Sequence, residues 1–524
     1  MAMSVESALE PDPTAAMPIG DHLQLGPRNA SAPISPGTRQ FQASRGAAKS
    51  LRPRKEQIPR ARRIDSSRRL NPSETAEPEL VRTLQVPPPA LAPVAPPNVV
   101  VTTFEGGVDD NTSIPPDPHA AFSQTHGFIP HNNNIHIVEL ANLHGAPTVY
   151  ALDAFWGVQG CFDPKVVYDA NVDRFFFVTM VGFDANSSLL IAVSSSGDPT
   201  QPWYRQQVQV DSTAQGQVWM DYPSLGFSSD KVTVQVNLFT TGQNMFAGST
   251  IYAFDKAALL NPGSSTVLQR FVLRNQGAGQ VPAVTHDPTM ADQYLVSTWT
   301  GDDGAGKGAL AVWRLSGSAA AGTVALFRVG FVTAAGTWDS FPPYDEFAPQ
   351  SGIGDRLDVG DDRMLTVAYR NGAFHCGHAV MLPAGGATRT AVQWWEVPIA
   401  TWTATVGRLD DPDGGVFYAY PSMAVNDRGD KLIGYAQFSS SIHPSGAYLL
   451  IHADGAKSAA VFAAGQNTYL KRFGGSKNRW GDYSATQVDS RDDHSFFTVQ
   501  EYAAAQQDTW ATRVAHITTV AGHV

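Results

Sequence analysis

The chain consists of short stretches of β-branched and aromatic residues separated by segments rich in Gly, Asp, Asn and Pro. Two sections show this pattern most clearly, and each predicts four consecutive strands. The predicted strands are residues 164–169, 174–181, 188–196 and 203–210, then 223–227, 232–239, 250–255 and 267–273. Runs of this length bounded by turn residues are typical of antiparallel strands. The fold class is therefore expected to be all-β.

Seven short segments repeat one pattern, in which a loop ends in an acid or Tyr, often followed by Pro, and a small or apolar strand comes next. The segments begin at Asp117, Asp163, Asp221, Val281, Asp355, Tyr420 and Asp482, and the fourth departs from the rule. Consecutive starts lie 46 to 74 residues apart. A four-stranded blade with its loops needs roughly 40–60 residues. The repeat predicts a single β-propeller of seven four-stranded blades.

The ends of the chain complete this expectation. The last repeat offers only three strands, at residues 484–488, 495–502 and 509–517, and the segment 99–104 is expected to supply the fourth. Such a closure removes the open edge of the ring. Residues 1–96, rich in Pro, Ser, Ala and Arg, are predicted to form a disordered tail before a propeller domain of residues 97–524. The basic stretch 44–69 is either a solvated tail or a contact for an acidic surface.

Composition narrows the possible functions. Gly (46) and Pro (36) are abundant and charged residues make up only 16% of the 524 residues, as in a loop-rich all-β protein. A net charge of −11 argues against a role that depends on neutralising nucleic-acid phosphates. No apolar run of 18 residues and no secretory signal is visible, so neither a membrane span nor a compartment is predicted. A monomer is expected.

The two cysteines leave their chemistry open. Cys161 and Cys376 allow either one long-range disulfide or two free thiols packed as small apolar residues. Cys376 lies between His375 and His378, but this group needs further ligands to form a zinc site.

The repeat also predicts a site. The innermost strand of each blade starts at one mouth of the central channel, so the residues that begin the repeats are expected to approach one another. Carboxylates gathered there would repel, recruit Arg or Lys, or bind a hard cation such as Ca²⁺. The expected metal ligands are Asp163, Asp221 and Asp482, and the expected ligand-binding residues are Asp117, Asp163, Trp219, Asp221, Tyr222, Arg356, Tyr420, Arg479, Trp480, Asp482 and Tyr483. The alternative is that each Asp only caps its own loop.

Several motifs resemble those of a family of bacterial β-propeller proteins of uncertain function, mostly secreted and loosely described as sialidase-like. The resemblance spans roughly residues 100–520 and rests on Asp163-Pro-Lys-Val-Val-Tyr-Asp, Trp219-Met-Asp-Tyr-Pro-Ser-Leu-Gly and Arg479-Trp-Gly-Asp-Tyr-Ser. It implies the propeller fold and transfers no catalytic residue. The roles that a sialidase needs can be assigned to Arg356, Arg479, Tyr420, Glu396 and Asp117.

Three functions remain open at this point. The first is a binding propeller that recognises a glycan, a peptide or a small polar ligand at an acidic, aromatic-lined mouth, with Ca²⁺ as a possible cofactor. The second is a carbohydrate-active hydrolase or lyase that uses carboxylates in the same mouth. The third is a scaffold whose outer blade edges contact partner proteins. Propellers carry many chemistries, so the fold alone does not choose among them.

Overall fold

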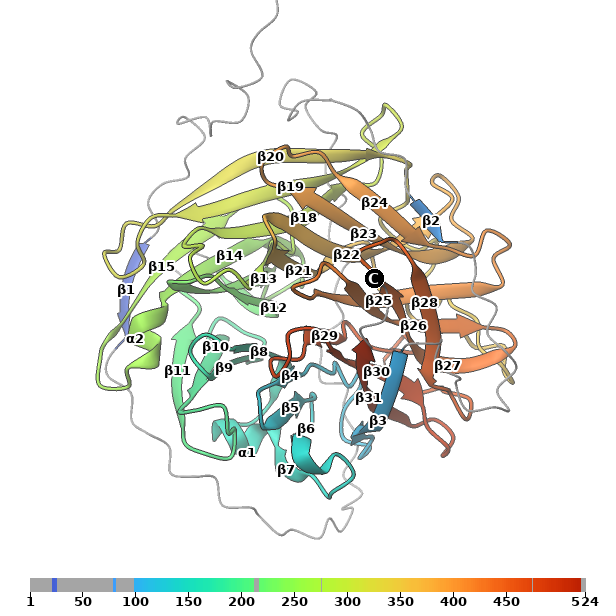
Figure 1. Ribbon diagram of the computed structural model, residues 1–524, viewed down its shortest axis with the longest axis horizontal. Helices are drawn as coiled ribbons and strands as arrows, with labels where there is room; N and C mark the ends of the chain where they lie inside the picture. Colours follow the sequence, from blue (N-terminus) through green and yellow to red (C-terminus); the bar gives the residue numbers. More distant parts are fainter. Residues whose placement is uncertain are drawn as a thin grey trace, which may run out of the picture.

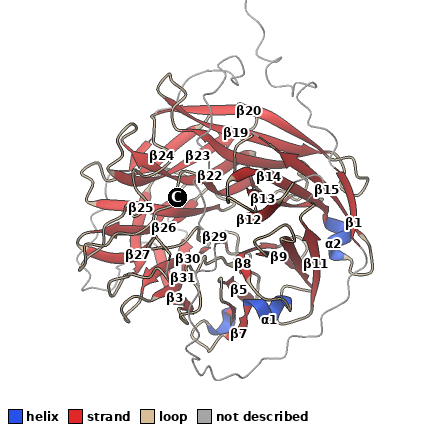
Figure 2. Ribbon diagram, turned by 180° about the vertical axis from the view of Figure 1, so that it is seen from behind, coloured by secondary structure: helices blue, strands red, loops and turns tan. Residues whose placement is uncertain are grey.

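A computed structural model gives the structure of the protein, and it describes residues 21–25, 79–81, 99–211, 216–274, 276–473 and 475–519. Its strands are arranged around a central axis as a β-propeller (Figure 1). Two five-residue helices are described, α1 (Leu152–Trp156) and α2 (Lys256–Leu260), and both lie at the periphery (Figure 2). No helix in the described part of the chain is long and apolar enough to cross a membrane.

Five sheets of four strands stand alone as blades. The first two comprise β4 (Ala121–Phe122), β5 (His126–Pro130), β6 (Asn134–Glu139) and β7 (Thr148–Ala151), then β8 (Cys161–Asp169), β9 (Arg174–Val181), β10 (Ser188–Ser194) and β11 (Trp203–Gln209). The third comprises β16 (Val281–Pro282), β18 (Gln293–Thr300), β19 (Lys307–Ser316) and β20 (Ala325–Ala335). The fourth comprises β25 (Val416–Val425), β26 (Lys431–Ser439), β27 (Ile442–Ile451) and β28 (Lys457–Ala463).

The fifth separate sheet joins both ends of the domain. It contains β29 (Ala485–Val488), β30 (Phe496–Ala503), β31 (Trp510–Thr519) and β3 (Val99–Val108). Strand β3 pairs antiparallel with β31, from Val99 opposite Thr519 to Val108 opposite Ala511. The segment predicted to supply the missing fourth strand therefore does so.

The prediction of seven separate blades is wrong, because the remaining strands form one sheet of eleven. This sheet contains two antiparallel ladders, β12 (Val218–Phe227) to β15 (Thr266–Leu273) through β13 (Lys231–Thr240) and β14 (Phe246–Asp255), and β21 (Met364–Arg370) to β24 (Thr405–Leu409) through β22 (Ala373–Leu382) and β23 (Arg389–Pro398). Strand β17 (Val284–Thr285) pairs in parallel with both β12 and β21. Strand β17 thus joins the two ladders into one sheet.

Two segments of the predicted tail are described as strands. Strand β1 (Asp21–Leu25) pairs antiparallel with β15, and β2 (Glu79–Val81) pairs in parallel with β24. Each adds to the outer edge of the eleven-stranded sheet. The rest of the predicted tail, including the basic stretch 44–69, lies outside the described residues.

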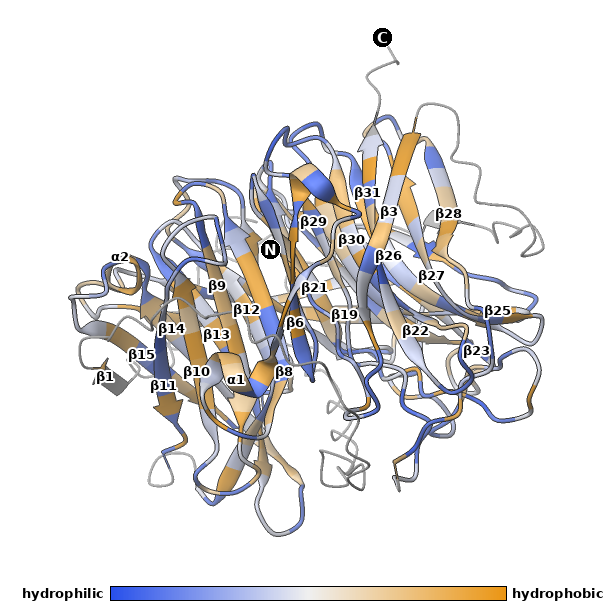
Figure 3. Ribbon diagram, turned by 90° about the horizontal axis from the view of Figure 1, so that it is seen from below, coloured by the Kyte–Doolittle hydropathy of each residue, from blue (hydrophilic) through white to orange (hydrophobic). Residues whose placement is uncertain are grey.

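Apolar side chains between neighbouring sheets hold the ring together. The largest cluster packs β8–β11 against β12–β15 and includes Phe176, Met180, Trp219 and Tyr252. Figure 3 shows apolar residues along the strands and mostly hydrophilic residues in the loops beyond their ends. Dispersion and burial of this kind supply most of the favourable energy of an all-β domain.

Both cysteines are buried free thiols. Burial raises the pKa of the Cys161 and Cys376 thiols, which makes them unreactive. His378 accepts a hydrogen bond of 3.0 Å from Trp395, while His375 lies opposite Glu396 in the ladder. These two histidines have different partners. Among the described residues, the group of three side chains that could hold a metal ion does not contain either of them.

Candidate functional site

The repeated motif forms a local distortion at the start of the inner strands. Asp117, Asp163, Tyr222 and Tyr420 all precede a proline and all have positive φ, between 46° and 55°. In β8, β12 and β25 the ladder register shifts at this point, which marks a β-bulge. Positive φ is uncommon for residues other than glycine, and bulges re-aim a side chain. The motif therefore turns its leading residue out of the regular pleat.

This geometry corrects the register of the third repeat. The residue of β12 that matches Asp163 is Tyr222, because it has the positive φ and precedes the proline. Asp221, one position earlier, is fully buried opposite Asn237. A one-residue offset changes the face of a strand, and the cluster of carboxylates that could hold a cation contains Asp117, Asp163 and Asp482 but not Asp221.

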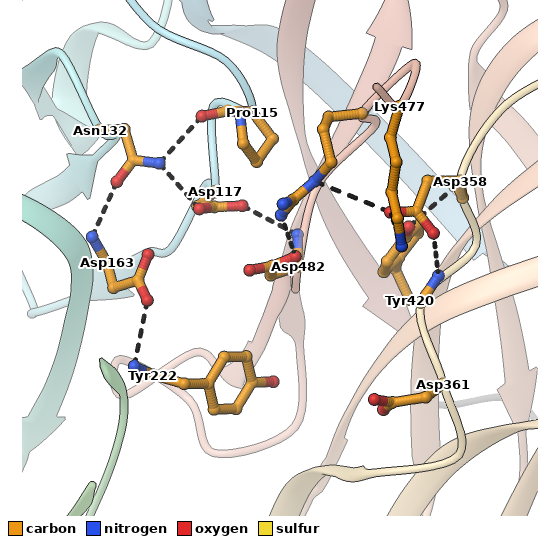
Figure 4. Close-up of polar contacts among 12 residues, drawn as sticks. Pro115, Asp117, Asn132, Asp163, Tyr222, Asp358, Asp361, Tyr420, Lys477 and Asp482 are labelled. Carbon is orange, nitrogen blue, oxygen red and sulfur yellow. Dashed lines mark hydrogen bonds and ion pairs between the residues drawn. The ribbon is translucent and has the colours of Figure 1, made fainter. Parts of the chain in front are cut away.

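Three carboxylates from three blades do meet. Oxygen atoms of Asp117, Asp163 and Asp482 all lie within 4.8 Å of one another. The first two side chains are fully buried, and that of Asp482 is 18% exposed. The backbone N–H of Asp482 donates to Asp117 Oδ1 at 2.8 Å, and that of Tyr222 donates to Asp163 Oδ2 at 3.2 Å (Figure 4). At these two places, a backbone N–H at the start of one inner strand holds the carboxylate of a neighbouring blade.

Asn132 connects this cluster. Its Nδ2 donates to Pro115 O at 2.9 Å and to Asp117 Oδ2 at 2.7 Å, while its Oδ1 accepts from Asp163 N at 2.8 Å (Figure 4). One buried amide therefore fixes two carboxylate-bearing loops relative to each other. The repeat does not contain Asn132, so the motif analysis missed it.

Lys165 lies beside the carboxylates, two residues after Asp163 in β8. It is 5% exposed, and its Nζ lies 3.1 Å from the ring centroid of Tyr483 and 5.4 Å from that of Tyr222. Burial lowers the pKa of the Lys165 ammonium to about 7, although the charges of Asp117 and Asp482 favour the protonated form. An amine of this kind in a site is a candidate functional group.

A second cation borders the same aromatic ring. Arg363 forms two hydrogen bonds, of 2.6 and 2.7 Å, with Asp361, and its Cζ lies 4.6 Å from the ring centroid of Tyr222. Burial raises the pKa of the Tyr222 hydroxyl, with the charges of Arg363 and Asp482 acting in opposite directions. In the sequence, Asp361 and Arg363 belong to a polar run that ends immediately before β21. The motif analysis began the fifth repeat at Asp355, before this run.

The other side of the mouth is an ion-pair network. Tyr420 donates its hydroxyl to Asp358 O at 2.9 Å, and Asp358 Oδ2 lies 3.7 Å from Arg479 Nε and 3.9 Å from Lys477 Nζ (Figure 4). Arg479 also donates to Asp482 Oδ1. Burial raises the pKa of the Asp358 carboxyl, and the two cations oppose this effect. Tyr420, Arg479 and Asp482 therefore lie together, as the repeat predicts.

Four expected site residues lie elsewhere or are covered. Trp219 and Trp480 are 0% and 1% exposed within hydrophobic clusters, so they are not open aromatic platforms. Arg356 donates to the Phe347 carbonyl at 2.7 Å in the long loop before β21. Asp355, in the same loop, contacts Arg472. The positions of these four side chains depend on which residues lie next to them in the fold, and the spacing of the sequence does not reveal those neighbours.

The sialidase roles do not assemble either. Glu396, assigned as the partner of a nucleophilic Tyr, lies in β23 and forms an ion pair of 3.0 Å with Lys431. Tyr420 contacts Asp358 instead, and Arg356 binds a backbone carbonyl. Of the five assigned residues, Asp117, Tyr420 and Arg479 belong to the mouth.

A cavity of about 280 Å³ lies along the inner strands, and its lining includes Lys165 but not Asp117, Asp163 or Asp482. It runs from Lys165 to Asp169 on β8, and its polar lining also includes Ser224, Thr366, Ser422, Ser484, Thr486 and Asp493. Its volume is close to the lower limit of ordinary ligand pockets, roughly 300 Å³. Apolar residues such as Val167 and Met423 complete the lining, so the channel is mixed in character, with Lys165 in its wall.

Glu501 is a buried acid beside this mouth, and its protonation provides a prediction. Burial raises the pKa of the Glu501 carboxyl well above its usual range, and the charges of Asp117 and Asp109 raise it further. Above pH 4.5 the unfolded chain releases a proton that the folded state retains, so wild-type stability falls as pH rises. The variant Glu501→Gln removes this loss, and its relative stability should grow by about 1.4 kcal/mol per pH unit up to the folded pKa. Urea denaturation at pH 5 and pH 8 measures the difference, and parallel pH profiles would contradict it.

No family model matches the chain, and no curated protein matches it. Solved structures do match. A protein of unknown function from Dyadobacter fermentans is 10% identical, with 68% of this chain and 94% of that chain covered and a TM-score of 0.36. Synechocystis apocarotenoid oxygenase is 13% identical over 66% and 71% of the chains, with a TM-score of 0.39.

A third match is the α-L-arabinanase of Penicillium chrysogenum, whose structure holds arabinobiose. It is 11% identical over 82% of this chain and all of that chain, with a TM-score of 0.36. Similarities this low carry no argument about function. The sialidase-like family resemblance remains an expectation, and the site must be interpreted from its own residues.

Proposed function

We propose that this protein is a binding propeller that holds a small, hydroxylated ligand of monosaccharide size in its central channel. The observation that carries the proposal is the proximity of two features along the chain. Carboxylates of Asp117, Asp163 and Asp482 converge within 4.8 Å, and Lys165, two residues after Asp163, lines a cavity of about 280 Å³.

The chemistry of the lining supports this class of ligand. Hydroxyl groups of Ser422, Ser484 and Thr486 form a connected network, with Ser484 Oγ 2.9 Å from Ser422 Oγ and Thr486 Oγ1 2.7 Å from it. Hydroxyls both donate and accept, so they match the hydroxyls of a sugar. Apolar residues of the same lining, such as Leu225 and Phe227, provide surface against which a sugar ring packs.

A monosaccharide panel tests the proposal. D-Glucose, D-glucosamine and D-glucuronate are added separately, and the melting temperature is measured, since a ligand that binds only the folded state must raise it. At least one sugar should raise the melting temperature of the wild type but not of Thr366→Trp, which fills the cavity. Thr401→Trp, at an exposed position, is the matched control. No shift, or an equal shift in Thr366→Trp, would reject the channel as the site.

A divalent cation, with Ca²⁺ as the named candidate, is part of the proposal. Hard cations prefer carboxylate oxygens, and Asp117, Asp163 and Asp482 offer three within 4.8 Å. The ammonium of Lys165 and the guanidinium of Arg479 already act on these carboxylates, so a bound cation must compete with them.

The expected result for calcium is a rise in melting temperature on titration that EDTA reverses. In Asp163→Asn the rise should be lost, because the substitution removes the charge of one ligand. Asparagine, like aspartate, tolerates the positive φ of this position. Asp221→Asn is the matched control, since Asp221 lies outside the cluster, and it should retain the calcium-dependent rise. A rise lost in Asp221→Asn and kept in Asp163→Asn would contradict the assignment, and no rise in the wild type would remove calcium from the account.

Hydrolysis of a glycosidic bond is the second candidate, because carboxyl groups gather at the mouth. Glycosidases use a pair of them, and one oxygen each of Asp117 and Asp163 lie within 4.8 Å of one another. A panel of p-nitrophenyl glycosides tests this candidate. Turnover that Asp117→Asn abolishes while the fold is retained would support it, and no turnover of any glycoside would leave the binding function.

A further inference from the structure

The outermost strand of the closing blade is β3, and no strand of the described chain covers its outer side. β3 is the last strand in its sheet, beside β31 (Figure 1). From Val99 to Glu105 its ladder with β31 runs without a register shift. In a regular antiparallel strand, alternate residues point their N–H and C=O groups away from the partner strand. The outer edge of β3 therefore presents a regular row of hydrogen-bonding groups.

The residues of this edge are unusual for an exposed strand. Residues 99–104 read Val-Val-Val-Thr-Thr-Phe, so all six are β-branched or aromatic. Val100 and Val108 are 55% and 52% exposed, and they are the two most exposed large hydrophobic side chains among the described residues. Proteins usually protect such an edge, because it is a template for pairing with another chain.

The other outer edges of the ring carry protection of this kind. Strands β15 and β24 are covered by β1 and β2, and β7 has only four residues. Strands β11, β20 and β28 contain the charged residues Arg205, Arg328 and Lys457. Among the outer strands that the structure describes, β3 is thus the long one that has neither a covering strand nor a charge in its first six residues.

The segments that precede β3 in the chain do not match this edge. Residues 1–98 contain no run of six residues that is free of Asp, Glu, Lys, Arg and Pro. Pro93, Pro96 and Pro97 lie within the six residues before Val99, and proline has no N–H to donate to a ladder. Six-residue segments of high β-propensity and low charge, without proline, are the ones that pair with copies of themselves. The edge of β3 therefore matches a second β3 better than any part of residues 1–98.

We infer that the protein forms a reversible two-fold dimer in which the outer edges of two β3 strands pair antiparallel, centred on Thr102. The closing blade of each copy has four strands, so the two blades form one sheet of eight. A contact of this kind uses the same surface on both copies. The inference is independent of the channel function, because β3 is the outer strand of its blade, and it differs from the monomer that the sequence predicts.

The register centred on Thr102 gives each side chain a suitable partner. Thr102 lies opposite Thr102 of the second copy, Val100 lies opposite Phe104, and Val101 lies opposite Thr103. Pairs of threonines and pairs of an aromatic with a β-branched residue stabilise antiparallel sheets. The sequence of β3 is therefore complementary to itself in this orientation.

Charge does not oppose the pairing. Glu105 is the one charged residue of β3, and it forms an ion pair of 3.5 Å with Arg513 of its own copy. It lies at the end of the paired segment, so the two Glu105 residues of the dimer are roughly 20 Å apart. The seven paired residues form roughly six to eight backbone hydrogen bonds. An interface of this size is small, and we therefore expect monomer and dimer to exchange.

Sedimentation velocity of the full chain, over a concentration series from micromolar to submillimolar, tests the inference. The average mass should rise with concentration from that of the monomer toward twice that value. Val100→Lys should weaken the dimer at least about tenfold, because a lysine then lies on the paired edge of each copy. Val149→Lys is the matched control, since Val149 is 39% exposed on the outer strand β7, and it should dimerise as the wild type does. A wild type that stays monomeric at every concentration would overturn the inference, and so would equal effects of the two substitutions.

A cross-link tests the register on a second variant. In Thr102→Cys the two-fold axis places the new thiols opposite each other, with Cα atoms about 4.5–5.5 Å apart, which is within the range of a disulfide. The native Cys161 and Cys376 are buried and do not compete. Oxidation should yield a covalent dimer of Thr102→Cys at least about tenfold faster than of Val149→Cys. If the mass rises with concentration but Thr102→Cys does not cross-link faster than Val149→Cys, the dimer uses another surface and the pairing of β3 is rejected.

Discussion

Replacing Asn132 by alanine should destabilise the protein by about 3–5 kcal/mol, more than any other single change at the mouth. The side chain makes three hydrogen bonds at 2.7 to 2.9 Å and is 6% exposed. A typical hydrogen bond contributes about 1 kcal/mol, and each buried group left without a partner costs roughly 1–3 kcal/mol. The backbone N–H of Asp163 and the carbonyl of Pro115 would both lose their partner in this variant.

The adjacent residue provides the control. Asn133 is partly buried, and its amide has no hydrogen-bond partner in the described part of the chain. Asn133→Ala should therefore change the free energy of unfolding by less than about 1 kcal/mol. Urea denaturation of the two variants measures the contrast. Equal losses of stability would show that Asn132 does not hold the carboxylate loops together.

Replacing Lys165 by methionine should stabilise the protein below pH 7, by on the order of 1–3 kcal/mol. The pKa of Lys165 falls from 10.5 to about 7 on folding because the ammonium is buried. The unfolded chain therefore binds more protons between pH 7 and pH 10.5, and wild-type stability rises with pH across this interval. Methionine removes the cost of the buried charge but also loses the cation–π contact, which is worth about 0.5–2 kcal/mol.

The pH dependence distinguishes this cause from a simple change of packing. The advantage of Lys165→Met should shrink as the pH rises from 7 toward 10.5, because the folded amine is neutral in this interval while the unfolded amine still carries its proton. Lys165→Arg keeps a charge at every pH, so it should be destabilised relative to wild type with a difference that grows from pH 7 to 10. A stability difference between Met and Lys that does not change with pH would contradict the buried-ammonium explanation. The groups facing Lys165 are Asp117, Asp482, Arg363, His119, Tyr222 and Tyr483.

Much of the fold follows from local pattern. The predicted strands between 164 and 210 match β8 to β11 within a few residues, since alternating apolar residues and Asp-, Asn- and Gly-rich turns both point to hairpins. The closing strand β3 was also predictable, because the last repeat lacked a strand and residues 99–104 are rich in β-branched residues. The merging of two ladders through β17 was not predictable from the sequence, since it depends on how the inner strands of neighbouring blades meet in space.

The site was partly predictable, and its errors have identifiable causes. The repeat found Asp117, Asp163 and Asp482, which do converge. It aligned the third segment on its acid, and therefore named Asp221 beside Tyr222 and counted Asp221 among the metal ligands. The proline that follows the bulge is the better marker. Lys165 was hidden in an apolar strand, and Trp480 was misjudged because aromatic residues next to a mouth also fill hydrophobic cores.

A crystal structure of the protein soaked with D-glucose and calcium chloride tests the central claim most directly. The account predicts density for the sugar in the channel cavity, between Lys165 and Thr366, with its hydroxyls within hydrogen-bond distance of Ser422 or Ser484. It also predicts a cation in contact with Asp117 and Asp163. A channel filled only by water, with sugar absent or bound at an outer blade edge, would contradict it.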